Sequence, residues 1–124
     1  MSVSRTFVDQ VRDLLDLVGP IDIRSMFGGK GLYFNGAIFG LLDDDELYFK
    51  TDDESKAPFI KAKCDQWTYP GQKGSTETRY YRPPDNAFES AEDMLPWAKS
   101  GIETAKRAQL KKAAKPVRKK KARP

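Results

Sequence analysis

Apolar residues near the start of the chain recur at the spacing of one helical face. Ser4 stands before them as a candidate N-cap, and Gly19-Pro20 follows as a helix stop. We therefore predict an amphipathic helix from about Ser4 to Val18. Its apolar face consists of Phe7, Val8, Val11, Leu14, Leu15 and Val18.

From residue 21 to residue 51 the pattern changes to short apolar runs separated by turn residues. It predicts strands at 21–27, 31–34, 37–42 and 46–51. Asn35-Gly36 is the strongest two-residue hairpin signal, because a type I′ turn requires a positive φ at both positions. Asp43-Asp44-Asp45 is the next turn. Since each connection is short, neighbouring strands should pair antiparallel.

The remaining sequence predicts further elements of both kinds. Residues 52–55 resemble a helix start, and a short helix is expected to run to about Lys63. A strand is expected at 78–82, with 67–69 as its hairpin partner. The last helix begins at the capping-box-like Ser90 or with Pro96 as its first residue, or it carries a kink at Pro96. Its apolar stripe is Leu95, Ala98, Ile102 and Ala105.

These elements predict an α+β fold in two layers. An antiparallel sheet, a β-meander of about four strands plus one or two more, would be packed by the N-terminal, middle and C-terminal helices. At 124 residues the chain is long enough for one domain with its own core. We expect this domain to span residues 1–105 and a basic, largely disordered tail to span 106–124.

Composition excludes several kinds of chemistry. The chain has no histidine, which excludes a Ser-His-Asp triad and His-ligated zinc, and its one cysteine, Cys64, excludes an internal disulfide. The sequence shows no signal peptide and no apolar run of transmembrane length. A cytoplasmic protein is the expectation, and no cofactor, metal site or catalytic residue is predicted.

Charge is divided unevenly along the chain. Residues 1–98 hold 11 lysines and arginines against 17 acids, a net charge of −6, whereas residues 99–124 hold 11 against the single acid Glu103, a net charge of +10. The body is therefore acidic and the C-terminal end strongly basic.

Three local patterns resemble functional motifs, but we prefer a structural interpretation of each. Gly28-Gly29-Lys30-Gly31 fails the phosphate-loop pattern, because position 24 is arginine and position 31 is glycine. The acids at 43–46 lack the alternate spacing of a calcium loop and fit a solvated turn. Cys64 has no histidine to activate it and fits a small buried apolar side chain.

Many aromatic residues fall on the predicted strands. An exposed aromatic sheet with basic neighbours can stack single-stranded bases. Strands 21–51, however, contain only Arg24, Lys30 and Lys50 as cations, and acids outnumber them. Because an acidic sheet repels phosphate, packing in the core and across strands is favoured. The residues are Tyr33, Phe34, Phe39, Tyr48, Phe49, Tyr80 and Tyr81.

The basic tail is the strongest functional signal in the composition. Ten positive charges fall in the 19 residues 106–124. Such a run attracts nucleic-acid phosphates by counterion release, and with few base-reading side chains the binding should be sequence-independent and salt-sensitive. A solvated tail that aids solubility or contacts acidic surfaces is the alternative. The residues are Lys106, Arg107, Lys111, Lys112, Lys115, Arg118, Lys119, Lys120, Lys121 and Arg123.

Two segments resemble a known bacterial family. RSMFGGKGLYFNGAIFGLLDDDELYFKTD (24–52) is similar to the signature of the TfoX/Sxy N-terminal domain, a family of competence regulators. YYRPPDNAFESAEDMLPWAKSGIETA (80–105) resembles the closing strand and helix of the same domain. The resemblance covers nearly all of residues 3–107. Gly28, Gly29, Gly31 and Gly36 match as structural positions.

The resemblance implies a regulatory role and no catalytic residues. It implies action in transcription of competence genes together with an activator of the cyclic-AMP receptor type. Full-length regulators of the family carry a second, C-terminal domain, whereas this chain has the basic tail in that place. A sequence-nonspecific nucleic-acid-binding protein that acts mainly through the tail is the alternative. A homodimer formed by strand addition at a free sheet edge is compatible with the pattern.

Overall fold

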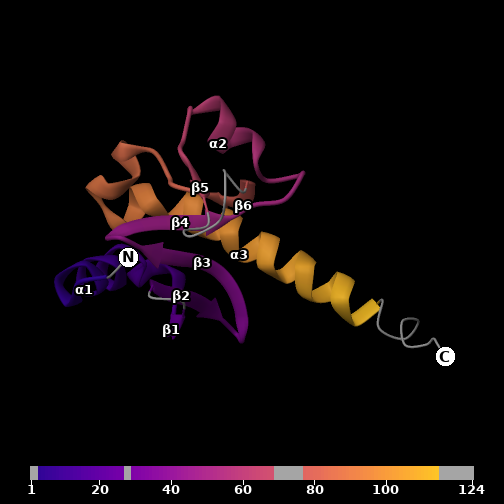
Figure 1. The fold of residues 1–124 in the computed structure, drawn as a ribbon, viewed down its shortest axis with the longest axis horizontal. Helices are drawn as coiled ribbons and strands as arrows, with labels where there is room; N and C mark the ends of the chain where they lie inside the picture. The colour runs from indigo at the N-terminus through magenta and orange to yellow at the C-terminus, as the bar shows by residue number, and fades with distance from the viewer. Residues whose placement is uncertain (1–2, 27–28, 69–76, 115–124) are drawn as a thin grey trace.

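The computed structural model describes residues 3–26, 29–68 and 77–114. It contains three α-helices, two short 3₁₀ segments and six strands (Figure 1). In chain order these are α1 (Arg5–Leu14), η1 (Asp16–Val18), β1 (Asp22–Met26), β2 (Gly29–Phe34), β3 (Ala37–Asp43), β4 (Glu46–Lys50), α2 (Ala57–Lys61), β5 (Gln66–Thr68), β6 (Glu77–Tyr81), η2 (Asp85–Glu89) and α3 (Ala91–Ala114).

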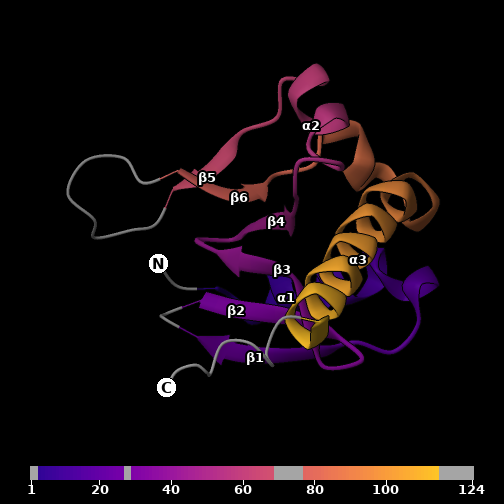
Figure 2. The same cartoon turned by 90° about the vertical axis from the view of Figure 1, so that its right-hand side faces the viewer.

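The six strands form one sheet in the order β1-β2-β3-β4-β6-β5, and every pair is antiparallel. Strands β1 to β4 follow one another as a meander, and the β5–β6 hairpin joins through β6. Helix α3 crosses this sheet (Figure 2). The α+β class and the antiparallel sheet packed by three helices are therefore confirmed.

One face of the sheet packs against the helices and holds the core. Leu47 and Phe49 of β4 point to this face, where Val11 and Leu15 from the α1 segment join them in one cluster. Helix α3 adds Met94, Ala98, Ile102 and Ala105, so the predicted stripe is buried except for Leu95. Because side chains alternate along a strand, Tyr48 and Lys50 turn to the opposite face.

The two predicted hairpin turns have the expected backbone. Asn35 and Gly36 have φ values of 51° and 81°, as a type I′ turn requires. Asp44 and Asp45 have φ values of 53° and 58°, so the second turn also uses left-handed residues. These turns set the registers Phe34↔Ala37 and Asp43↔Glu46.

The boundaries of α1 and α2 differ from the sequence expectation. Helix α1 ends at Leu14 and continues as the 3₁₀ segment η1, although Ser4 caps it as predicted by accepting from Phe7 N at 3.1 Å. Residues 52–55 form a turn rather than a helix start, since Asp52 Oδ1 accepts from the backbone N–H groups of Glu54 and Ser55. Helix α2 is therefore only Ala57–Lys61.

Helix α3 begins at Ala91 and keeps Pro96 inside it. Ser90 Oγ accepts from Asp93 N at 3.0 Å, so the Ser90 start is confirmed and the Pro96 start is wrong. The helix runs to Ala114, so residues 106–114 of the predicted tail are helical. Residues 116–124, for which disorder is predicted, lie outside the described residues.

Gly101 permits the close approach of α3 to the sheet. A Cβ at this position would lie 2.9 Å from the backbone oxygen of Phe39 and 3.4 Å from Phe49 Cβ. We expect Gly101→Val to lower the free energy of unfolding by about 3 kcal/mol, because a backbone atom must move to relieve the overlap. Thermal unfolding followed by circular dichroism measures this. Lys106→Val, at an exposed position of the same helix, is the control, and an equal loss there would contradict the contact.

Candidate functional site

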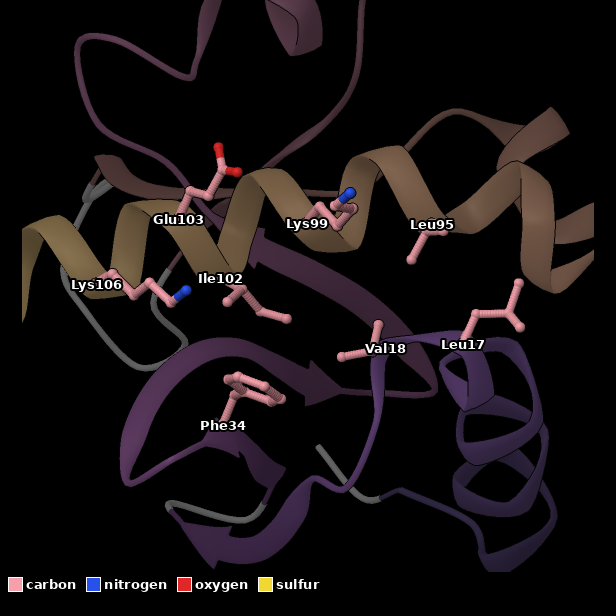
Figure 3. A pocket seen from close by; sticks show the side chains of 8 residues that line it. All are labelled: Leu17, Val18, Phe34, Leu95, Lys99, Ile102, Glu103 and Lys106. Carbon is pink, nitrogen blue, oxygen red and sulfur yellow. The ribbon is translucent and has the colours of Figure 1, made fainter.

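A groove of about 230 Å³ lies between α3, η1 and the end of β2 (Figure 3). Its apolar wall consists of Leu17, Val18, Phe34, Leu95 and Ile102, and the charged residues Lys99, Glu103 and Lys106 complete it. Figure 3 shows Phe34, Val18 and Ile102 pointing toward the same space. Leu17 is 50% exposed at the edge of this apolar wall.

Local structure explains why the groove is open. Residues 95, 99, 102 and 106 of α3 recur every three or four positions and so share one face of the helix. Helix α1 ends before Leu17 and Val18, and the 3₁₀ segment turns these two side chains toward α3. Phe34, the last residue of β2, lies on the helix face of the sheet and packs against the core.

The charges beside the groove favour an anionic partner. Lys99 and Lys106 stand two helical turns apart, and Glu103 is the one carboxylate in the lining, so the lining carries more positive than negative charge. Neither lysine forms an ion pair with any residue that the structure describes. The groove is thus suited to an apolar segment that carries a carboxylate.

A polar cluster beside the groove joins the second half of α3 to the segment after β4. Arg107 donates to both carboxylate oxygens of Asp52, with Nε at 2.8 Å and Nη2 at 2.9 Å. Ser55 Oγ lies 3.0 Å from Asp52 Oδ1 and 2.7 Å from Thr104 Oγ1. We call Asp52, Ser55, Thr104 and Arg107 the α3 latch.

The α3 latch is partly shielded from solvent, since the side chains of Asp52 and Arg107 are 21% and 29% exposed. Hydrogen bonds from Arg107, and then from Ser55, hold the pKa of Asp52 well below its ordinary value near 3.8. The same pair raises the pKa of Arg107. The Arg107 guanidinium is therefore paired with Asp52 of the domain.

The structure separates the ten predicted tail cations into two groups. Lys106, Arg107, Lys111 and Lys112 lie on α3, where Lys106 borders the groove and Arg107 belongs to the latch. Lys115, Arg118, Lys119, Lys120, Lys121 and Arg123 lie outside the described residues. Nucleic-acid binding by these residues stays a prediction.

The acidic turn, Cys64 and the glycine-rich segment each have a structural role in the fold. Asp43 Oδ2 accepts from Trp67 Nε1 at 2.9 Å, and Asp45 Oδ1 accepts from Ser4 N at 2.7 Å, so these carboxylates join the turn to its neighbours. Cys64 packs against the core, and burial raises the pKa of its thiol, which disfavours a nucleophilic thiolate. Gly29 and Gly31 lie within β2, and Gly28 is outside the described residues.

The strand aromatics divide between the two faces of the sheet. Phe34, Phe39, Phe49 and Tyr81 belong to or pack against the core, as the packing interpretation predicted. Tyr48 and Tyr80 on the other face pack against Trp67, with ring centroids 6.3 and 6.1 Å away. Burial raises the pKa of Tyr80 to about 12. Asp22, Asp43 and Glu46 share this face with Arg24 and Lys50, and Arg82 pairs with Glu46 at 2.7 Å, so these residues supply no excess of cations to attract phosphate.

Sequence reasoning missed the groove, although part of its signal was present. Leu95 and Ile102 belong to the predicted stripe, but Leu17 and Val18 were expected to continue the first helix or its end.

A second hollow, of about 370 Å³, includes Lys56 and Arg79, and both pair with Asp53. It therefore offers no unpaired cation. Among the helices that the structure describes, none is long and apolar enough to span a membrane.

Comparison with known proteins identifies what this chain is similar to. The family model of the TfoX N-terminal domain matches residues 13–105. Protein Sxy of Escherichia coli (strain K12) is 24% identical over 104 residues, which are 84% of this chain and 50% of that protein. The chain thus spans about half the length of the curated relative that it matches.

Proposed function

Since the chain belongs to the TfoX N-terminal domain family, we propose that it is a non-enzymatic module of competence-type transcription regulation that acts through protein contacts. The family match carries this proposal, because residues 13–105 include all six strands, every groove residue except Lys106 and every latch residue except Arg107. The partner that the resemblance implies is an activator of the cyclic-AMP receptor type.

The groove is the surface that we assign to this partner. An exposed leucine beside a wall of apolar side chains supplies the water-excluding centre of an interface, and Lys99 and Lys106 supply its charged rim. The chain's own basic tail is a poor occupant, because the same two lysines repel it. A partner segment with apolar side chains and a carboxylate fits both features.

Binding of the purified activator to the immobilised full chain tests the proposal. Leu17→Asp should weaken binding roughly ten-fold or more, because it places a charge at the centre of the contact. Ile60→Asp is the matched control, since Ile60 is 52% exposed and lies on α2, away from the groove. If the unaltered chain fails to bind, the partner is wrong, and if both variants bind equally, the groove is not the contact.

A second role, supported by the charge division of the chain, is weak sequence-nonspecific binding to nucleic acid through the basic tail. Replacing Arg118, Lys119, Lys120 and Lys121 by glutamine in the full chain should weaken duplex DNA binding. The slope of log affinity against log salt should fall by up to about 4, because each lost phosphate contact removes about one counterion. Fluorescence anisotropy across a salt series measures both quantities.

Lys61→Gln with Lys63→Gln removes two exposed cations from the body and serves as the control. An unchanged slope in the tail variant would assign the tail to solubility rather than to nucleic acid. A slope that falls only in the control would move the phosphate contact to the body.

A further inference from the structure

Strand β1 is the last strand on one side of the sheet (Figure 2). It pairs with β2 through the register Asp22↔Tyr33 to Met26↔Gly29, and no described strand pairs with its outer edge. Every second residue of an edge strand directs its backbone N–H and C=O groups outward. These groups are a template for another strand.

Strand β1 has no lysine, proline or bulge to protect its edge, and its two charged side chains are Asp22 and Arg24. Proteins block such edges with lysine, proline, a bulge or a very short strand. The sequence of β1, DIRSM, contains neither lysine nor proline, and its register with β2 is continuous over its five residues. At the other edge, the described part of β5 has three residues and an irregular register. The edge of β1 is therefore the better template.

The charges of β1 are complementary to a second copy of itself. Asp22 and Arg24 lie on the same face of the sheet, where they form a loose ion pair within the strand at 3.8 Å and their side chains stay 67% and 61% exposed. An antiparallel pair of β1 strands centred on Asp22 or on Arg24 would place like charges opposite each other. Centring on Ile23 places each Asp22 opposite the partner's Arg24, twice in the pair.

We propose that two copies of this chain associate through β1, antiparallel and centred on Ile23, to form one continuous sheet across a two-fold axis. Opposite charges directly across antiparallel strands stabilise the pairing, and like charges destabilise it. The charge pattern therefore selects this register over its neighbours. The association uses the backbone edge of β1, none of whose residues lines the groove, and it does not depend on the activator.

Sedimentation equilibrium of the full chain at concentrations up to about 100 µM tests the proposal. The unaltered chain should form a dimer. Asp22→Arg alone and Arg24→Asp alone should each weaken it roughly ten-fold or more, because each change turns two attractive pairs into repulsive ones. Asp22→Arg combined with Arg24→Asp should restore the dimer, since the pairs are then attractive again with their signs exchanged.

Circular dichroism of each variant verifies folding, and the double variant keeps the test decisive if one single variant unfolds. A chain that stays monomeric throughout the range would overturn the proposal. A dimer that persists equally in both single variants would place the interface elsewhere. Failure of the double variant to recover would exclude the register centred on Ile23.

Discussion

Phe49→Ala is expected to lower the free energy of unfolding by about 4 kcal/mol. Phe49 is fully buried, and its ring stacks on Phe39 with centroids 6.2 Å apart. It also lies under Gly101 of α3, so removing the ring leaves a cavity between the sheet and the helix. Domains of this size are stable by only about 5–15 kcal/mol, so the loss takes a large share of the total.

Tyr48→Ala is the matched control, because Tyr48 is the adjacent residue and points to the opposite face of the sheet. Tyr48 packs against Trp67 and stays partly exposed, so its removal should cost only about 1 kcal/mol. Urea unfolding of the two variants compares them directly. Equal losses would contradict a core confined to the helix face.

Asp52→Ala is expected to lower the free energy of unfolding by about 3 kcal/mol at neutral pH. The change removes both oxygens that accept from Arg107 and the acceptor for the backbone N–H groups of Glu54 and Ser55. It also leaves the partly shielded Arg107 with Glu54 as its remaining ion-pair partner, at 3.7 Å. The second half of α3 should then loosen from the body.

The effect of Asp52→Ala should depend on pH in a defined direction. Because the folded state lowers the pKa of Asp52, the carboxylate contributes stability that is fully present above its unfolded pKa near 3.8. That contribution is lost as the pH falls through 3.8 toward the lower folded value. The difference in melting temperature between unaltered chain and variant should therefore shrink from pH 7 to pH 3.

Arg79→Ala serves as the control for the α3 latch. Arg79 forms an ion pair with Asp53 at 3.9 Å, but its side chain is 65% exposed, so its loss should cost less than about 1 kcal/mol. A melting difference for Asp52→Ala that stays constant with pH would contradict the role assigned to the carboxylate. A loss as small as that of Arg79→Ala would do the same.

Local sequence signals predicted most strands of the sheet and their antiparallel pairing. Asn35-Gly36 sets one turn through its positive φ values, and the short connections make the neighbouring strands antiparallel. Helix boundaries were less predictable, because they depend on contacts between distant segments. The sequence around Asp52 resembles a helix start, but the Asp52 carboxylate accepts from the backbone N–H of Glu54 and closes a turn. The same carboxylate accepts from Arg107, which lies 55 residues further along the chain.

The groove could be predicted only in part for the same reason. The apolar spacing of α3 identified Ile102, but Leu17 becomes a groove residue through the end of α1 at Leu14, which no local residue type signals. Arg107 reads as one more tail cation because only the fold brings Asp52 to it. The basic residues after Ala114 were recognised from composition alone.

In vitro transcription from a promoter that depends on the cyclic-AMP receptor type activator tests regulation most directly. We predict that the full chain changes the transcript yield in the presence of the activator and not in its absence. Leu17→Asp should abolish the change and Ile60→Asp should preserve it. The four tail substitutions should weaken it most at low salt, where contacts between the tail and phosphate contribute most. A yield unaffected by the full chain at any concentration that binds the activator would contradict the proposed regulatory role.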